Sequence, residues 1–349
     1  MRVEKAINKK GKLLGITVWL LLALMFVGCN KQADESEGQD DILSDNVIIT
    51  ETGEIVEKEN TEVNDEEAKA MTTPKSTLVD AELLVEPEQE KVVTQEDQTE
   101  PQGNKLQLVF LGDSIFDNYR DGTGVPYRTG IQCEADYYNL AIGGTTAAVA
   151  RDEQIGWEEW TSRSLVGMVN AIAKNIPTDI FENDTAKTIL DNPNVDFSKT
   201  DYFIVEYGMN DFLCATPLSS ESNEADLKSY AGALRYAVVT LKSVAPDATI
   251  ILCAPTYAQF YNGEGNWMIG DGNSINNGYG TLFDYKGICE YVANEKQVLF
   301  FNAYQNLGIN GYTAEEYLED GIHLTDEGRQ LYADALTEMI LENEETKNN

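Results

Sequence analysis

Blocks of apolar and polar residues alternate along the last two thirds of the chain, and they predict strands that alternate with helices. Short apolar runs rich in β-branched and aromatic residues, bounded by turn residues, are typical of buried strands. Such runs lie at 106–112, 136–141, 201–207, 248–254 and 297–302, and helical patterns lie at 158–174, 224–244, 282–294 and 325–342. This order predicts one α/β domain with a central parallel sheet over residues 105–345. Two longer stretches, 176–200 and 255–281, are expected to be irregular.

The N-terminus has a different pattern, which is typical of an export signal. A basic segment, 1–12, precedes an apolar run from Leu13 to Val27 and then Gly28 and Cys29. The end of this run resembles the lipobox of bacterial lipoproteins. We therefore expect a lipoprotein signal peptide over 1–29, lipid on Cys29, and a protein anchored to the outer face of a bacterial membrane. The alternative is a transmembrane anchor, for which an apolar run of about 15 residues is short against the ~20 needed.

The next segment, residues 30–104, is acidic and poor in apolar residues. It contains 22 acidic residues against 5 basic ones and no aromatic residue. Too little apolar surface is present to offset the entropy of ordering, so we expect a disordered linker. The whole chain has a formal net charge of −35, and a surface this acidic repels phosphate backbones, so no nucleic-acid partner is expected.

The cysteines give little support to a metal site. Apart from Cys29 they are Cys133, Cys214, Cys253 and Cys289, which are widely spaced and form no C-x-x-C pair. The sequence does not decide how these four would pair in an exported protein, or whether they pair at all. Neither a metal nor another cofactor is expected.

Four short motifs at predicted strand ends or helix entrances carry the candidate chemistry. They are Gly112-Asp113-Ser114-Ile115, Asn139-Leu140-Ala141-Ile142-Gly143-Gly144, Gly208-Met209-Asn210-Asp211 and Asp320-Gly321-Ile322-His323. Because ligand crevices of open α/β sheets lie at the carboxyl ends of the strands, one edge of the sheet is expected to gather all four.

The residue types in these motifs fit nucleophilic catalysis. Serine is a weak nucleophile until a base accepts its proton, and His323 is the only histidine in the chain. Asp320 precedes His323 by three residues, a spacing that allows its carboxylate to hold the imidazole in one tautomer. We therefore predict Ser114 as nucleophile, His323 as base and Asp320 as the orienting acid. Glu319 is expected to be solvated, or to replace Asp320 if the turn differs.

An acyl-transfer site also needs donors for the oxyanion that forms on the substrate. The candidates are the backbone N–H groups of Ser114 and Gly144 and the side-chain amide of Asn210. Gly143 stands beside Gly144, so the glycine donor is either of the two.

Together the four motifs resemble the SGNH or GDSL hydrolase family over about 105–343. The resemblance implies a flavodoxin-like three-layer sandwich, no metal requirement, and hydrolysis of esters or thioesters through an acyl-enzyme. It also implies that Ser114, Gly144, Asn210 and His323 are the family's four named residues, with Asp320 as its acid. Phe116 and Asp117 stand where many members carry small residues, which predicts that they shape the acyl pocket. Asp113, Asn139 and Asp211 are expected to order loops.

The substrate is less well defined by the sequence. Aromatic residues among amides in the 255–281 stretch (Tyr257, Phe260, Tyr261, Trp267 and Tyr279) suit sugar rings or, alternatively, packing of the loop on the domain. We expect removal of short acyl groups, such as acetyl, from glycans. The alternatives are a lipase or thioesterase, an acyltransferase using the same site, and a glycan-binding lipoprotein without catalysis. The oligomeric state is not predicted.

Overall fold

The computed structural model describes residues 105–150, 162–263, 265 and 267–347. The predicted signal peptide over 1–29, with Cys29, and the predicted linker over 30–104 lie outside these residues. No helix in the described part of the chain is both long and apolar enough to cross a membrane.

The centre of the domain is a sheet of five parallel strands. The strands are β1 (Gln107–Gly112), β2 (Asp136–Asn139), β3 (Tyr202–Glu206), β4 (Thr249–Cys253) and β7 (Leu299–Phe301). Their order across the sheet is β2-β1-β3-β4-β7, and every neighbouring pair is parallel. All five lie at predicted positions. The carboxyl ends of β1 and β3 are adjacent, since Gly112 is paired with Glu206.

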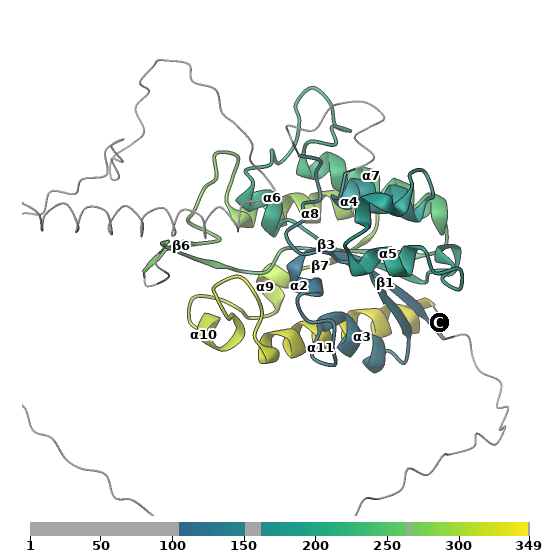
Figure 1. The fold of residues 1–349 in the computed structure, drawn as a ribbon. Coiled ribbons are helices and arrows are strands. Elements are labelled where there is room, and N and C mark those ends of the chain that lie inside the picture. The colour runs from purple at the N-terminus through teal and green to yellow at the C-terminus, as the bar shows by residue number, and fades with distance from the viewer. Residues whose placement is uncertain (1–104, 151–161, 264, 266, 348–349) are drawn as a thin grey trace, which may run out of the picture. The chain divides into compact units, whose positions relative to one another are not determined.

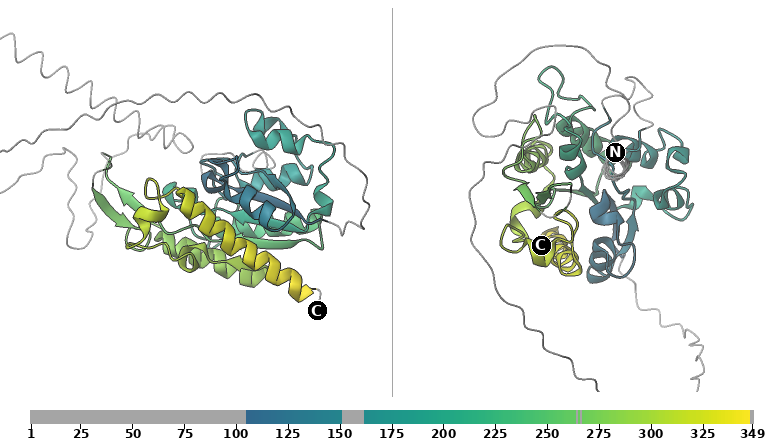
Figure 2. Two further views of the ribbon diagram at one scale, coloured as in Figure 1. Left: turned by 90° about the horizontal axis from the view of Figure 1, so that it is seen from below. Right: turned by 60° about the vertical axis from the view of Figure 1, so that its left-hand side comes forward.

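Helices cover both faces of the sheet, which makes the domain a three-layer α/β sandwich with flavodoxin-like strand order. One face carries α3 (Val125–Gln132) and α11 (Asp326–Lys347), which pack side by side (Figures 1 and 2). The other face carries α4 (Leu165–Ile172), α7 (Tyr230–Val244) and α8 (Leu282–Lys296). The predicted fold class is confirmed.

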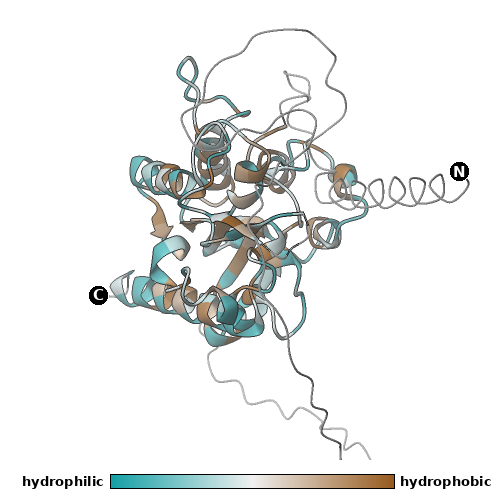
Figure 3. Cartoon of the chain, turned by 90° about the vertical axis from the view of Figure 1, so that its left-hand side faces the viewer, coloured by the Kyte–Doolittle hydropathy of each residue, from teal (hydrophilic) through white to brown (hydrophobic). Residues whose placement is uncertain are grey.

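The apolar runs form the core because both faces of the sheet are covered. Leu108, Val109, Phe110 and Leu111 of β1 are fully buried, and so are Phe203 and its neighbours in β3. Figure 3 shows apolar strands in the middle of the domain and polar residues along the flanking helices. Such two-sided burial explains why the strands read as continuous apolar runs and not as alternating ones.

Two predicted helices begin later than expected. The pattern over 224–244 becomes helical only at Tyr230, because the side chains of Asn223 and Asp226 accept hydrogen bonds from backbone N–H groups two residues on and hold the chain in turns. Ser229 then caps α7 through the Gly232 N–H. The helix predicted over 158–174 begins at Leu165 and ends at Ile172; its residues 158–161 lie outside the described part of the chain.

The stretches expected to be irregular contain short elements. Residues 176–200 include η2 (Thr178–Phe181), α5 (Thr185–Leu190) and η3 (Phe197–Lys199), and residues 255–281 include an antiparallel hairpin of β5 (Gln259–Tyr261) and β6 (Met268–Asp271). Four further short helices are α2 (Ser114–Asp117), α6 (Met209–Leu213), α9 (Ala303–Asn306) and α10 (Ala314–Tyr317). Strands of three and four residues with a bulge between Phe260 and Tyr261 leave no alternation for a sequence pattern to detect.

Candidate active site

Ser114 is the first residue of α2, directly after the carboxyl end of β1. Asp113 caps this helix, and its Oδ1 accepts a hydrogen bond from the Ile115 N–H at 3.0 Å. The turn requires Gly112, because a Cβ there would lie 2.8 Å from the Phe116 ring and 3.1 Å from the Glu206 carbonyl oxygen. The sharp change from strand to helix therefore presents the Ser114 side chain at the edge of the sheet.

The structure brings Ser114, His323 and Asp320 into one hydrogen-bonded chain. His323 Nε2 lies 2.9 Å from Ser114 Oγ, and His323 Nδ1 lies 2.7 Å from Asp320 Oδ2. Asp320 Oδ1 accepts the backbone N–H groups of Ile322 and His323 at 3.0 and 2.8 Å. Because these bonds fix the carboxylate, the imidazole carries its hydrogen on Nδ1 and leaves Nε2 to accept the Ser114 hydroxyl.

The Asp320–His323 pair shifts the pKa of both members. Burial alone would raise the pKa of Asp320, but hydrogen bonds from the His323 ring and from two backbone N–H groups hold it below its usual range. The hydrogen bond to Asp320 raises the pKa of His323, against an opposing effect of burial. The pair thus favours a charged imidazolium, which is the state that follows proton transfer from serine.

The glycine motif leaves one backbone donor free beside Ser114. The Gly143 N–H donates to Asp117 Oδ2 at 2.7 Å, and the other carboxylate oxygen of Asp117 accepts from Arg120 Nε at 2.6 Å. In the described part of the chain, the Gly144 and Ser114 N–H groups donate to no other group. Gly144 has a φ of +76°, a conformation that favours glycine. Of the two glycines, Gly144 therefore has the available donor.

Asn210 connects the nucleophile motif to the glycine motif. It lies in α6, which begins directly after β3 and Gly208, and its amide donates to Asp113 Oδ2 at 3.0 Å and to the Thr145 carbonyl oxygen at 3.1 Å. The amide nitrogen therefore has two acceptors and lies between the loops that carry Ser114 and Gly144.

The residues expected to order loops do so. Asn139 donates to the Phe116 carbonyl oxygen and accepts from the Ala141 N–H. The carboxylate of Asp211 accepts two backbone N–H groups, those of Ala147 and Ala148. Burial raises the pKa of Asp211 to about 7, although both N–H groups oppose this.

Glu206 is a third buried acid besides Asp113 and Asp211, and it was not predicted from the sequence. It is fully buried at the end of β3, and no donor in the described residues reaches either carboxyl oxygen. Burial, and then the negative charge of Asp113, raise the pKa of Glu206 well above its ordinary value. Burial also raises the pKa of Asp113 to about 6. The sequence feature that could have indicated Glu206 is a charged residue inside the otherwise apolar run of 202–207.

Replacement of Glu206 by glutamine is expected to raise the stability relative to the wild type more at pH 8 than at pH 5. A carboxyl group whose pKa is raised in the folded protein contributes its full stability at a pH below its pKa in the unfolded chain. This contribution is lost as the pH rises toward the pKa in the folded protein, by at most about 1.4 kcal/mol per pH unit. Glutamine has nearly the same shape as glutamate and is neutral at both pH values, so it removes the titration. The melting temperature of Glu206→Gln minus that of the wild type should grow by roughly 5 °C between these pH values. Glu338→Gln, an exposed matched change, should show no growth; an equal difference at both pH values would contradict this prediction.

A cluster of Tyr119, Glu319 and Arg329 holds the loop after α2 against the loop of residues 319–323. The Tyr119 hydroxyl donates to Glu319 Oε1 at 2.6 Å, and Arg329 Nη1 lies 3.2 Å from the same oxygen. The guanidinium carbon of Arg329 lies 3.4 Å from the centre of the Tyr119 ring. Arg329 is buried and also donates to the carbonyl oxygens of Thr123 and Leu324. Glu319 is therefore partly exposed but bonded, and Asp320 is the acid that contacts His323.

The β5–β6 hairpin supports the 319–323 loop from its other side. The Gln259 N–H donates to the Gly321 carbonyl oxygen at 2.8 Å. Of the aromatic residues predicted to bind sugars or to pack on the domain, Tyr257 and Phe260 are buried, whereas Tyr261 and Trp267 are exposed. Packing on the domain is therefore confirmed for Tyr257 and Phe260, and the sugar-binding alternative stays a prediction for the exposed residues.

Phe116 does not line a pocket at Ser114, contrary to the prediction. It is fully buried, and its ring packs edge-on against the rings of Phe110 and Tyr332. The tight turn at Ser114 directs this side chain into the core. Asp117 does face the glycine motif, where it binds the Gly143 N–H.

In the described part of the chain, none of Cys133, Cys214, Cys253 and Cys289 forms a disulfide. Burial raises the pKa of Cys289 to about 12, so this thiol is neutral at physiological pH. Across the described ranges, no group of three or more histidine, cysteine, aspartate or glutamate side chains is arranged to hold a metal ion.

Several solved structures are similar to this chain. A protein from Lactobacillus plantarum is 18% identical, with a TM-score of 0.49, and the match covers 68% of this chain and 96% of that one. A possible lipase from Chitinophaga pinensis is 18% identical, with a TM-score of 0.46 and coverage of 68% and 98%. A carbohydrate acetylesterase from Sinorhizobium meliloti is 14% identical, with a TM-score of 0.42 and coverage of 68% and 99%. No curated protein sequence matches.

A family model gives the assignment. Residues 110–331, well over half of the chain, match the model of the GDSL-like lipase/acylhydrolase family. This range contains all four motifs and the Ser114–His323–Asp320 chain. The protein belongs to the GDSL-like lipase/acylhydrolase family.

Proposed function

We propose that this protein is a serine esterase that cleaves carboxylic esters through an acyl-enzyme. The observation that carries the proposal is the chain of hydrogen bonds from Ser114 Oγ through His323 to Asp320, at 2.9 and 2.7 Å. A hydroxyl within reach of an imidazole that is itself oriented by a carboxylate is the arrangement that activates serine.

In the first step His323 Nε2 accepts the proton of Ser114 while Oγ attacks the ester carbonyl. Asp320 stabilises the resulting imidazolium. His323 then gives the proton to the departing alcohol, which leaves the acyl group on Ser114. Water attacks this acyl-enzyme with His323 again as the base, and the serine and the carboxylic acid are released.

The oxyanion of each tetrahedral intermediate is bound by the backbone N–H groups of Ser114 and Gly144. The Asn210 amide becomes the third donor by exchanging its hydrogen bond to the Thr145 carbonyl oxygen for one to the oxyanion. The support for the first two is that both donors are free, and that the Asp117 carboxylate fixes the neighbouring Gly143 N–H. Donors held in place before the charge forms lower the barrier without reorganisation. The support for Asn210 is its position between the two loops.

The acyl group is short, acetyl in the first instance, and the alcohol part is a glycan. The glycine motif is close to Ser114, since a Cβ on Gly143 would lie 3.7 Å from Ser114 Cβ and 3.3 Å from Asp117 Oδ2. This narrow, charged side suits an acetyl group better than an alkyl chain. The aromatic residues exposed on the hairpin next to the 319–323 loop support the glycan.

The protein acts outside the cell, anchored by lipid on Cys29 to the outer face of a bacterial membrane, with 30–104 as a linker. The support is the sequence alone, namely the basic and apolar segments, the cysteine and the acidic composition. A lipid anchor would keep the enzyme at the surface, where glycans are found.

Hydrolysis of a panel of esters tests the substrate. We expect release of acetate from 4-nitrophenyl acetate and from acetylated xylotriose, and at least ten times lower kcat/KM for 4-nitrophenyl dodecanoate. Faster hydrolysis of the dodecanoate would favour a lipase and contradict the short acyl group. Transfer of acetyl to added xylotriose in preference to water would identify an acyltransferase.

A further inference from the structure

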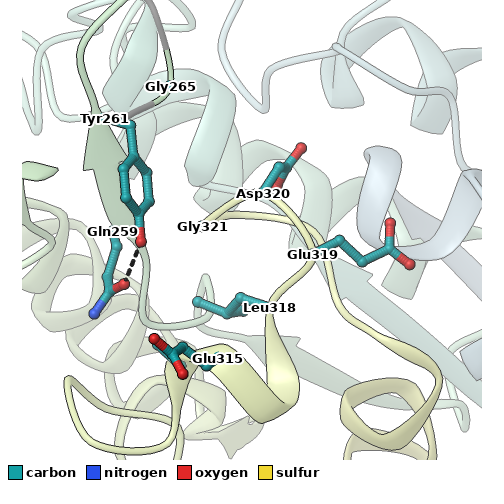
Figure 4. A pocket seen from close by; sticks show the side chains of 9 residues that line it. Gln259, Tyr261, Gly265, Glu315, Leu318, Glu319, Asp320 and Gly321 are labelled. Atoms are coloured by element: carbon teal, nitrogen blue, oxygen red, sulfur yellow. Dashed lines mark hydrogen bonds between the residues drawn. The ribbon is translucent and has the colours of Figure 1, made fainter. Parts of the chain in front are cut away.

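A pocket next to the 319–323 loop is not used by the steps described above. It has a volume of about 430 Å³ and lies between the β5–β6 hairpin and α10. Figure 4 shows Gln259 and Tyr261 on one side, Leu318 and the backbone of the 319–323 loop on the other, and the Glu315 side chain extending from α10. A concave site of this size is within the range that holds small ligands.

The order of proton transfers decides which part of the substrate lies on this side of Ser114. His323 donates its proton to the departing alcohol, so the alcohol oxygen must approach His323 Nε2. The carbonyl oxygen and the acyl group lie toward the Ser114 and Gly144 N–H groups. The pocket borders Asp320 and Gly321, which precede His323 by three and two residues. It is therefore on the side of the alcohol.

The lining of the pocket indicates the chemistry of that alcohol. The Tyr261 side chain is 40% exposed and offers one ring face to the C–H groups of a sugar, and its hydroxyl donates to Gln259 Oε1 at 2.9 Å. The Glu315 carboxylate makes no hydrogen bond or ion pair in the described residues, so its oxygens are free to accept from sugar hydroxyl groups. An aromatic face next to carboxylate and amide groups is suited to a pyranose ring.

The charges of the lining residues narrow the class of alcohol that the pocket can bind. The described residues that line the pocket include Glu315 and Asp320 but no lysine or arginine. Glu319 also borders it, and Figure 4 shows its carboxylate directed away, toward its bonds with Tyr119 and Arg329. The Asp320 carboxylate is likewise directed to its bonds with His323. A phosphate or a uronate would therefore meet the Glu315 carboxylate and no lysine or arginine of the lining.

We propose that this pocket binds a neutral pyranose of the alcohol part of the ester, with Tyr261 stacking on the ring and Glu315 accepting from its hydroxyl groups. The proposal rests on the proposed function, because it assumes that the enzyme deacylates glycans. It makes Tyr261 and Glu315 specificity residues on the alcohol side, separate from the residues that activate Ser114.

The test compares two acetate esters that differ in their alcohol. For the full chain and for the variants Glu315→Ala and Tyr261→Ala, kcat/KM is measured with acetylated xylotriose and with 4-nitrophenyl acetate. The ratio of the two values is expected to fall about tenfold in each variant, mainly through KM for acetylated xylotriose. Tyr261 also lies next to Gly321, so Tyr261→Ala could displace His323. Such a displacement lowers kcat/KM for both substrates alike, and it therefore cancels in the ratio. Glu338→Ala, an exposed carboxylate on α11, is the matched control and should keep the wild-type ratio.

Binding of xylotriose without its acetyl groups gives a measurement independent of turnover. By titration calorimetry the dissociation constant should rise about tenfold in both Glu315→Ala and Tyr261→Ala and stay unchanged in Glu338→Ala. An unchanged ratio and unchanged binding in both pocket variants, with a wild type that deacetylates xylotriose, would overturn the pocket and leave the proposed function intact. A wild type that hydrolyses 4-nitrophenyl acetate but not acetylated xylotriose would overturn the glycan substrate and the pocket with it.

Discussion

Replacement of Ser114 by alanine is expected to lower kcat for 4-nitrophenyl acetate roughly 10⁴-fold or more, because the covalent intermediate can no longer form. The Ser114 hydroxyl makes one hydrogen bond, to His323 Nε2, and the side chain is only partly buried. The melting temperature should therefore stay within about 2 °C of the wild type, since such changes cost little stability. Steady-state kinetics and thermal unfolding measure the two effects.

Two controls test whether Ser114 is the nucleophile: labelling by a serine-directed probe and a double variant with His323. A fluorophosphonate probe should label the wild type and Ser219→Ala, in which an exposed serine is removed, but not Ser114→Ala. The double variant Ser114→Ala/His323→Ala should be no slower than either single variant, because residues that act as one unit are not additive. Labelling that persists in Ser114→Ala, or a loss of activity below tenfold, would exclude Ser114 as the nucleophile.

The sequence was sufficient to predict the core of the site because its chemistry stands at strand ends. In a parallel sheet the carboxyl ends of adjacent strands meet, and β1 is adjacent to β3, as the flavodoxin-like fold implied by the resemblance requires, so Ser114 after β1 and Asn210 after β3 are neighbours. The assignment of His323 as the base did not depend on the topology, since it is the only histidine in the sequence. The hydrogen-bond geometry of Asp320 also follows from its spacing of three residues, which lets one carboxylate bind both the ring and the backbone of His323.

What the sequence could not predict depends on contacts between distant residues. Arg329 joins loops about 200 residues apart, and nothing in its local pattern distinguishes it from an exposed arginine on a helix. Gly143 and Gly144 have the same local context, and only the Asp117 carboxylate, which binds Gly143, leaves Gly144 free. The β5–β6 hairpin was not predicted because its strands are short and bulged and show no alternation of apolar and polar residues. Its structure depends instead on packing against Gly321.

Two independent supports thus hold the 319–323 loop in place. The Tyr119–Glu319–Arg329 cluster fixes its beginning against the loop that follows Ser114, and β5 fixes Gly321 by a backbone hydrogen bond. Neither support touches the reacting atoms. Both position His323, whose distance to Ser114 Oγ decides whether the proton can be transferred.

Gly321→Ala is expected to show how much catalysis depends on the second support. Gly321 has a φ of +90°, and a Cβ there would lie 2.3 Å from the Gln259 carbonyl oxygen and 2.9 Å from the Tyr261 ring. Since the clash is with backbone, the loop and β5 must separate. We expect kcat to fall on the order of 10²-fold, because a displacement of about 1 Å has this effect. The free energy of unfolding should fall by about 2–5 kcal/mol, from backbone strain and overpacking together.

Gly278→Ala separates the clash from the backbone strain. Gly278 has a φ of +95°, and no atom lies within 4 Å of the position of its Cβ, so alanine there carries strain alone, about 1 kcal/mol, and kcat should not change. The single histidine gives a direct measure of the displacement, because one imidazole resonance can be titrated by proton NMR. In Gly321→Ala the pKa of His323 should move down toward its ordinary value as the hydrogen bond to Asp320 loosens, whereas in Gly278→Ala it should stay raised. Equal stability, kcat and His323 pKa in the two variants would mean that β5 does not position the 319–323 loop.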